Sequence, residues 1–218
     1  MKKIILMLVL IALYGHTSNA QEEQKLRMDY RERFMVGVKV GANFSNVYDK
    51  NGQPFHTESK LGLATGLMLA IPIGKYIGLQ PEVLFSQKGF KATSTVTDNA
   101  YVLTRTSNFI DVPFMLAAKL APFLTLLAGP QYAYLISQKN TFENASTSIS
   151  KEQDFENENT RKNMFCFTAG FDITLKHVVI AARAGWDLQN NSSAGAISTS
   201  HYKNNWIQAT LGYRFYKP

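Results

Sequence analysis

Residues 60–88 read KLGLATGLMLAIPIGKYIGLQPEVLFSQK, and this stretch decides the fold. From Leu61 to Ile71 every second residue is Leu, Ile or Thr, and the positions between them hold Gly, Ala or Met. After a short turn at residues 72–76 the alternation returns up to Lys88, with polar residues on the second face. Because side chains two residues apart share one face of a strand, the stretch predicts a hairpin with one apolar face and one small or polar face. Each arm has about 11 residues, the length of a strand that crosses a membrane at a tilt.

The same unit repeats along the chain and predicts eight strands. They are expected at residues 34–45, 61–71, 77–88, 106–120, 124–137, 163–175, 178–188 and 204–216. Three connections are tight turns, near Gly74, Pro122 and His177, and four are long and polar, at residues 46–59, 89–104, 138–162 and 189–203. Alternating short turns and long loops are typical of transmembrane barrels, in which an even number of strands places both chain ends in the periplasm. The sequence therefore predicts an all-β domain at residues 34–218. This domain is an eight-stranded antiparallel transmembrane β-barrel with short periplasmic turns and long extracellular loops.

Alternation alone does not say which face points outward, and a soluble, lipocalin-like barrel would place its apolar face inside. Three features favour an apolar exterior. The other face is rich in Gly and Ala, which a narrow eight-stranded lumen requires, and it also carries the charges. Aromatic residues gather towards the strand ends, as interfacial girdles do. They are Tyr76, Phe123, Tyr132, Tyr134, Trp186, Tyr213 and Phe215.

The N-terminus has the features of an export signal. Two lysines precede an apolar run at residues 4–14, and small residues end at Ala20, so we expect residues 1–20 to be a signal peptide that is cleaved there. An uncleaved anchor is the alternative, although the apolar run is short for a transmembrane helix. Residues 21–33 are polar and charged and are expected to form a periplasmic N-terminal segment.

Composition restricts the function classes. The formal charge of +7 falls to +5 once Lys2 and Lys3 are removed, and the remaining basic residues are scattered, so no nucleic-acid partner is expected. Cys166 is the single cysteine, which excludes an intramolecular disulfide and a thiolate zinc site. The G-x-S-x-G, H-E-x-x-H and Walker motifs do not occur, and no cofactor or metal is expected.

Charged residues recur on the face expected to line the lumen. They are Lys39, Glu82, Lys88, Asp111, Lys119, Asp172, Arg183, Asp187 and Arg214. Charges in a narrow lumen are costly unless they are paired. We therefore predict a salt-bridge and hydrogen-bond network that plugs the barrel. Its acids would be Glu82, Asp111 and Asp172, and its bases Lys39, Arg183 and Arg214. The lining of a small pore and a catalytic or ligand site are the alternatives, but an eight-stranded barrel leaves little room for an open channel.

Two loop segments offer weaker candidates. Ser198, Ser200 and His201 suggest a hydrolase on the barrel rim, but a nucleophile needs its base within hydrogen-bond reach and an orienting acid, which neighbours in a loop do not establish. The acidic segment from Glu143 to Glu158 is expected to be a solvated loop, with divalent cations or a partner as the alternative ligands.

Five segments together resemble the PorT-like outer-membrane β-barrel proteins. They are GVKVGANFS at 37–45, LQPEVLFSQKG at 79–89, FIDVPFML at 109–116, AGPQY at 128–132 and LGYRF at 211–215. The resemblance implies an eight-stranded barrel in the outer membrane, and it implies little about activity because the family is mostly defined by its fold. The terminal aromatic residue that the barrel-insertion machinery reads would be Phe215 or Tyr216, with two residues beyond it.

We therefore expect a non-enzymatic integral outer-membrane protein with a structural, adhesive or envelope-assembly accessory role. Its partners would be outer-membrane lipid, the barrel-insertion machinery and an envelope protein that binds the extracellular loops. One alternative is a small-solute pore, whose conductance would change on Glu82→Ala or Arg214→Ala. Another is a lipid-modifying barrel enzyme that depends on His201.

Overall fold

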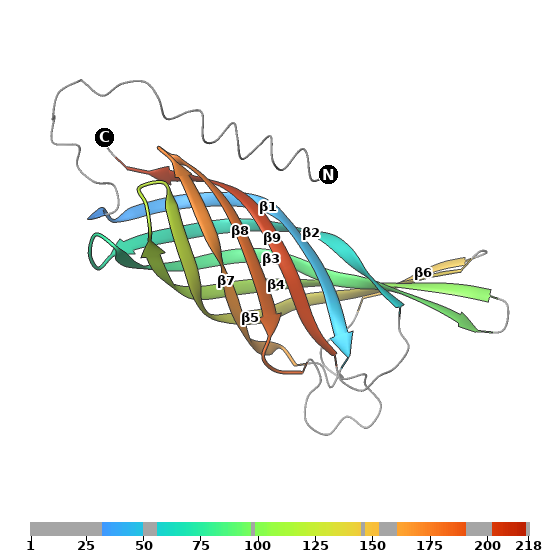
Figure 1. The fold of residues 1–218 in the computed structure, drawn as a ribbon. Coiled ribbons are helices and arrows are strands. Elements are labelled where there is room, and N and C mark those ends of the chain that lie inside the picture. The colour runs from blue at the N-terminus through green and yellow to red at the C-terminus, as the bar shows by residue number, and fades with distance from the viewer. Residues whose placement is uncertain are drawn as a thin grey trace, which may run out of the picture.

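The fold is described by a computed structural model, which covers residues 32–49, 56–96, 99–144, 147–152, 161–190 and 202–216. Nine strands lie in these residues, and all of them except β6 form a closed barrel. Figure 1 shows how the barrel is wound. The strands are β1 (Met35–Asp49), β2 (His56–Pro72), β3 (Ile77–Val96), β4 (Asn99–Lys119), β5 (Leu124–Asn144), β6 (Thr147–Glu152), β7 (Asn163–Leu175), β8 (Val178–Asp187) and β9 (Tyr202–Phe215). The predicted eight-stranded antiparallel barrel is confirmed. The ninth strand, β6, was not predicted and lies outside the barrel.

The barrel closes by antiparallel pairing of each strand with its neighbours. Strands that follow one another in the chain pair side by side, except that β7 pairs with β5 and skips β6. The seam is the β1–β9 ladder, which runs from Val36↔Phe215 to Asp49↔Tyr202 without a register shift. Because no strand of the barrel is left as an edge, the backbone groups of the spanning segments are paired within the sheet, as lipid requires.

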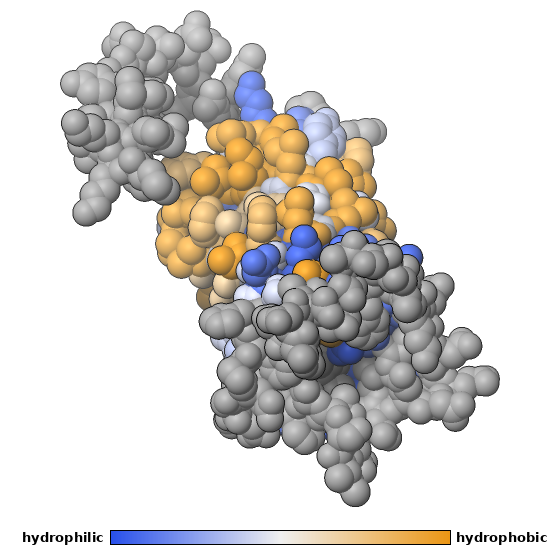
Figure 2. Space-filling view, turned by 90° about the vertical axis from the view of Figure 1, so that its right-hand side faces the viewer, coloured by the Kyte–Doolittle hydropathy of each residue, from blue (hydrophilic) through white to orange (hydrophobic). Residues whose placement is uncertain are grey.

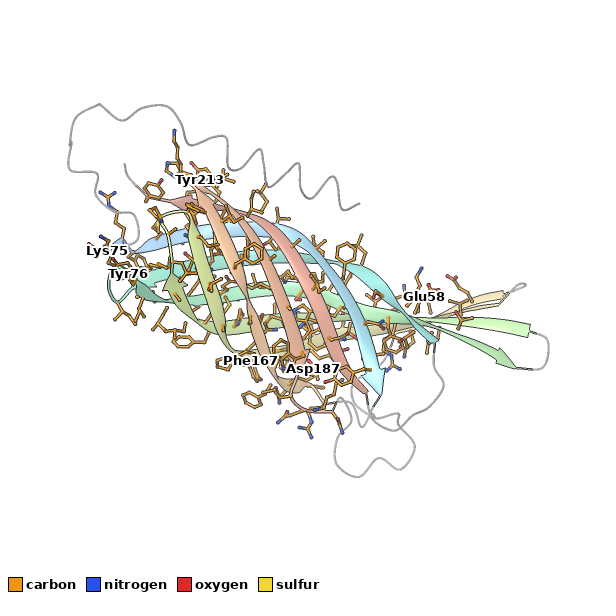
Figure 3. All side chains as sticks on the ribbon, in the orientation of Figure 1. Glu58, Lys75, Tyr76, Phe167, Asp187 and Tyr213 are labelled. Carbon is orange, nitrogen blue, oxygen red and sulfur yellow. The ribbon has the colours of Figure 1, made fainter. Side chains whose placement is uncertain are left out.

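Large apolar side chains cover the outside of the barrel. Leu61, Leu67 and Phe114 are each more than half exposed, whereas the inward-facing Ala64, Met68 and Met115 are 1% exposed. Figure 2 shows apolar residues gathered in a band across the face of the barrel that it presents. Tyr76 and Tyr213 lie at the end of the barrel that carries the tight turns (Figure 3). The apolar face therefore points outward as predicted, and the lipocalin-like arrangement with an apolar interior is wrong.

The tight turns lie where the sequence placed them. The β2–β3 turn is closed by a bond of 3.1 Å from the Ile73 amide to the Ile77 carbonyl, and the β4–β5 turn by one of 3.2 Å from Ala121 to Leu124. The β7–β8 turn needs a left-handed residue, and Lys176 supplies it with φ of 54°. Short turns lie at the periplasmic end of transmembrane barrels, so we expect these three turns to face the periplasm and call their end of the barrel the periplasmic end.

Two of the predicted long loops are wrong. Residues 89–104 are mostly paired strand, because β3 continues to Val96 and β4 begins at Asn99. In the segment 138–162, β5 runs to Asn144 and turns back as β6. Thr is enriched in strands and recurs in both segments, so the end of the apolar alternation did not mark the end of the strand. We call residues 56–59, 89–96, 99–106, 138–144 and 147–152 the projecting sheet, which extends beyond the barrel in Figure 1.

The N-terminal predictions fall almost entirely outside the described residues. This applies to the signal peptide at 1–20 and to the segment 21–33 except its last two residues. Within the described ranges, no helix is long and apolar enough to cross a membrane.

Candidate functional site

The lumen holds the charged residues of the barrel, and five of the six predicted network residues meet near its periplasmic end. They come from five strands: Lys39 from β1, Glu82 from β3, Asp172 from β7, Arg183 from β8 and Arg214 from β9. Alternation along each strand points these side chains inward, and all five are at least 94% buried. We call this group the periplasmic network.

Ion pairs at hydrogen-bond distance hold the periplasmic network together. The Lys39 Nζ atom lies 2.8 Å from both carboxylate oxygens of Glu82. Arg183 Nη2 lies 2.5 Å from Asp172 Oδ1 and 3.7 Å from Glu82 Oε1. Arg214 Nη2 donates to Asp172 Oδ2 at 3.0 Å. Each acid therefore faces two bases. The Arg183–Asp172 pair joins the neighbouring strands β8 and β7, and the other three pairs join strands that are not neighbours in the sheet.

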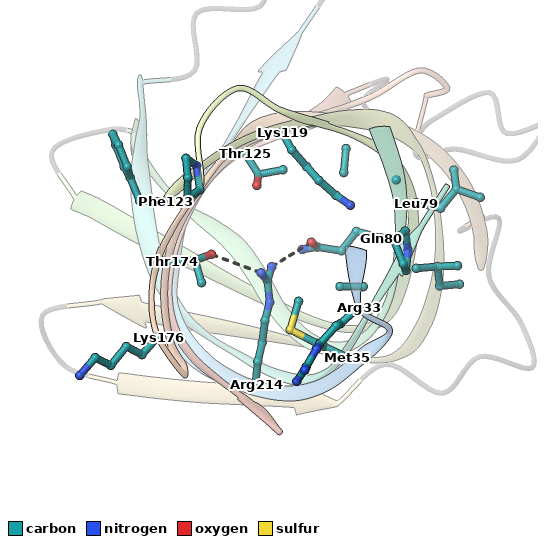
Figure 4. Close-up of a pocket in the computed structure, with 16 residues that line it drawn as sticks. Arg33, Met35, Leu79, Gln80, Lys119, Phe123, Thr125, Thr174, Lys176 and Arg214 are labelled. Carbon is teal, nitrogen blue, oxygen red and sulfur yellow. Dashed lines mark hydrogen bonds between the residues drawn. The ribbon is translucent and has the colours of Figure 1, made fainter. Parts of the chain in front are cut away.

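Gln80 completes the periplasmic network. Its Nε2 atom donates to Glu82 at 2.9 Å and to Asp172 at 3.0 Å, and its Oε1 atom accepts from Arg214 Nη2 at 3.1 Å. Arg214 Nη1 also donates to the Thr174 hydroxyl at 3.2 Å (Figure 4). Gln80 was not among the predicted residues, although it shares the inward face of its strand with Glu82, which was the signal that could have found it.

Asp111, the sixth predicted residue, lies in a second cluster. Its Oδ2 atom is 2.8 Å from Lys88 Nζ, and that ammonium lies over the Trp206 ring, 3.7 Å from the centroid. Asp187 belongs to the same cluster and accepts from the Asn204 amide at 2.8 Å and from the Cys166 thiol at 3.1 Å. We call this cluster the outer group.

Trp206 is the residue of the outer group that sequence reasoning missed. It occupies an inward position of β9, two residues before Gln208, and it is 4% exposed. The alternation placed it in the lumen, but a large aromatic ring was not expected in a narrow polar interior. The cation–π contact with Lys88 explains how a buried ammonium and an indole ring share the space.

Most, but not all, buried polar atoms of the lumen have a hydrogen-bond partner. Within the described residues, four buried side-chain atoms have no hydrogen-bond partner: Asp111 Oδ1, Gln131 Nε2, Arg183 Nε and Arg214 Nε. The periplasmic network has three bases and two acids, whereas the outer group has one base, Lys88, and two acids. The lumen is therefore polarised, with excess positive charge towards the periplasm.

The weaker candidates fall largely outside this description. Ser198, Ser200 and His201 lie outside the described residues, as does much of the acidic segment that begins at Glu143. Cys166 is buried, and its thiol donates to Asp187. Among the described residues, no three His, Cys, Asp or Glu side chains are grouped so that they could hold a metal ion.

Comparison with solved structures finds similarity to proteins of low sequence identity. The attachment invasion locus protein Ail of Yersinia pestis is 14% identical, with 83% of this chain and 98% of that chain covered and a TM-score of 0.45. Neisserial surface protein A is 8% identical, with 83% and 97% covered and a TM-score of 0.45. OprG from Pseudomonas aeruginosa is 10% identical, with 85% and 98% covered and a TM-score of 0.40.

Comparison of sequences is more decisive. No curated protein matches the chain. Residues 19–192, however, match the family described as outer membrane protein beta-barrel domain. Since this match spans well over half of the chain, the protein belongs to the outer membrane protein β-barrel domain family and is a protein of the outer membrane.

Proposed function

We propose that this protein is a closed, non-enzymatic barrel that presents the projecting sheet outside the cell for contact with an envelope or surface partner. Its role is structural, adhesive or accessory to an envelope assembly. The observation that carries the proposal is the continuation of β3, β4 and β5 beyond the apolar band as one hydrogen-bonded sheet. The pairing extends to Val96↔Asn99 between β3 and β4 and to Val102↔Glu143 between β4 and β5.

The projecting sheet has its own stabilising contacts. Phe90 and Ala92 form a buried apolar cluster, with Val47 and Leu103 packed against it. The Arg105 Nε atom donates a hydrogen bond of 2.8 Å to the Asn140 Oδ1 atom on the neighbouring strand. These contacts favour a defined surface over a mobile loop, which lowers the entropy cost of binding a partner.

The sheet also ends in a strand that offers backbone groups to a partner. Among the described residues, β6 pairs only with β5, through the ladder from Lys139↔Glu152 to Asn144↔Thr147. A strand with one unpaired edge can accept an added strand from another chain. Strand addition is therefore the mode of contact that this surface fits best.

The lumen supports an anchor more than a pore. Met68, Leu84 and Met115 are inward-facing and at most 2% exposed, and the periplasmic network adds paired charges beside them. A small-solute pore remains the second candidate because charged side chains line the lumen. Planar-bilayer recordings separate the two: we expect no conductance from the wild type. Conductance steps in the wild type whose size changes on Glu82→Ala or Arg214→Ala would instead support a small-solute pore.

The exported form is part of the proposal. We infer that residues 1–20 are removed by signal peptidase, so that the mature chain begins at Gln21, which intact-mass measurement of the outer-membrane fraction tests. The PorT-like assignment, the contact with the insertion machinery and the envelope partner belong to the same proposal. A lipid-modifying activity would contradict it and would appear as a lipid profile that depends on His201.

Surface labelling tests the orientation. Lys91 is exposed in the projecting sheet and Lys75 is exposed in a tight turn at the other end. We expect a membrane-impermeant maleimide to label Lys91→Cys on intact cells and to label Lys75→Cys only after permeabilisation. Cys166 is buried and gives little background. The opposite pattern would invert the barrel and end the proposal.

A shortened variant tests the role of the sheet. Lys91 and Thr104 are paired, so a two-residue Asn-Gly turn can replace residues 92–103 without a change of register. A closed barrel resists SDS until it is boiled, so an unchanged shift on a gel would show that the variant still folds. We expect it to lose the cross-links to the partner that a photoreactive residue at Lys91 forms in the full-length chain. Cross-links that persist, or that form equally from position Lys75, would contradict the proposal.

A further inference from the structure

The periplasmic end of the lumen contains a cavity of about 230 Å³, which we call the vestibule (Figure 4). Small inward residues leave this space: Ala70, Gly78 and Ala117 line it. Two residues further into the barrel on the same strands, Met68 and Met115 fill the lumen. The same strands surround the lumen at both depths. The vestibule therefore exists because the inward residues there are smaller than the methionines deeper in the barrel.

The vestibule is positively charged. Arg33, Lys119, Lys176 and Arg214 line it, and none of its described lining residues is acidic. Figure 4 shows Lys119 and Arg214 directed into the lumen and Lys176 directed away from it. The excess positive charge of the periplasmic network lies directly behind Arg214. The matching excess of negative charge is in the outer group, and the acid that faces Arg214 is Asp172 of the periplasmic network.

Arg214 presents a donor that the described residues do not use. Its Nη1 atom donates to Thr174, and its Nη2 atom donates to Gln80 and Asp172. Its Nε atom is buried and has no acceptor among the described residues, and the residue as a whole is only 6% exposed. A buried charged donor without an acceptor is costly, and a guanidinium favours carboxylate or phosphate oxygens.

We propose that the vestibule binds a small organic anion from the periplasm, a carboxylate or phosphate on a short apolar chain. The anionic group accepts hydrogen bonds from Arg214 Nε and from Lys119 Nζ, an ammonium that also donates to the Gly74 carbonyl at 3.2 Å. The apolar part lies against Met35, Ala70 and Ala117. The volume sets the size of this ligand, because pockets for drug-sized molecules run from about 300 to 1,000 Å³. The site is independent of the surface contact proposed above and faces the opposite side of the membrane.

Arginine side-chain NMR gives a direct readout of this site. The mature protein, ¹⁵N-labelled at arginine and placed in phosphatidylcholine nanodiscs, is titrated with sodium hexanoate while the Nε–H signal of Arg214 is followed. Arg214→Lys assigns that signal. We expect a saturable shift with hexanoate, no shift with uncharged hexanol, and weaker binding of inorganic phosphate, which lacks the apolar part.

Matched variants separate the site from a general charge effect. Lys119→Gln removes one proposed donor and is expected to lower the affinity for hexanoate about tenfold, equivalent to ~1.4 kcal/mol. Lys75→Gln removes a lysine at the same end of the barrel that does not line the vestibule, and it should bind as the wild type does. Ala117→Leu fills the cavity without a change of charge and should abolish binding. An unboiled gel shift identifies the variants that fold.

Several results would overturn the proposal. The Arg214 Nε–H signal could shift with hexanoate without saturating, or shift equally with hexanol. Phosphate could bind as tightly as hexanoate, or the Lys119→Gln variant could bind hexanoate as well as the Lys75→Gln variant does. If Ala117→Leu does not fold, Lys119→Gln and the hexanol comparison decide the outcome. None of these measurements depends on a partner at the projecting sheet, so the two proposals can fail separately.

Discussion

Replacement of Asp172 by asparagine tests whether the periplasmic network holds the barrel together. Asp172 is fully buried, and its two oxygens accept from Arg183, Arg214 and Gln80. Asp172→Asn keeps the shape of the side chain but removes the charge and one acceptor. The new amide group then faces donors, and the network is left with three bases and one acid.

The magnitude follows from the pairs that remain. Removal of one partner from a buried ion pair costs about 3–5 kcal/mol. Arg183 retains Glu82 at 3.7 Å, and Arg214 retains the Gln80 oxygen and the Thr174 hydroxyl as acceptors. We therefore expect the lower end of the range, about 3 kcal/mol, which is roughly two orders of magnitude in the unfolding equilibrium constant.

The assay is denaturant unfolding of the protein refolded into lipid vesicles, followed by tryptophan fluorescence and by the unboiled gel shift. Glu58→Gln is the control, because it makes the same chemical change at an exposed acid of the projecting sheet (Figure 3). An exposed pair contributes about 1 kcal/mol or less. If Asp172→Asn and Glu58→Gln lower the free energy of unfolding equally, the network does not stabilise the barrel and the reasoning fails.

Two further predictions concern close contacts in the lumen. Gly170→Ala should prevent the unboiled gel shift, because a Cβ atom there would collide with the backbone of the neighbouring strand, whereas Gly74→Ala, with nothing within 4 Å, should fold normally. Lys88→Met should lower the free energy of unfolding by about 3 kcal/mol, since it leaves Asp111 buried without its cation, and it should change the fluorescence of Trp206. Normal folding of Gly170→Ala, or an unchanged Trp206 signal, would contradict these contacts.

The barrel was predictable because each spanning strand has to satisfy lipid on one face and a narrow lumen on the other. That requirement produces a period of two in the sequence, most clearly from Leu61 to Lys88, and the period predicts the strand count. The direction of each face came from the small and charged residues on one face and from the aromatic residues near the strand ends. The projecting sheet was not predictable in this way. From Gly89 to Val96 both faces of β3 lie beyond the lipid, so polar residues suit either face and the alternation stops while the pairing continues.

The lumen residues were predictable as a set but not as pairs. Alternation places Lys39, Glu82 and Asp111 on the inward face, yet the depth of each along the barrel depends on the tilt and stagger of its strand. Strand tilt and stagger bring Glu82 on β3 to Lys39 on β1, which is not its neighbour in the sheet. They bring Asp111 on β4 to Lys88 on the adjacent β3, although Asp111 is paired in register with Leu84. The sequence holds no simple signal for these distances, so one predicted network became two clusters.

The β1–β9 seam has a consequence for biogenesis. Val36 lies near the start of the barrel domain and pairs with Phe215, almost at its end, so closure has to wait until the whole chain has been exported. Contacts this distant in sequence make folding slow and leave unpaired strand edges exposed in the meantime. The first strand to be synthesised, β1, therefore cannot complete its pairing until β9 is present. A truncation before β9 would leave the barrel open.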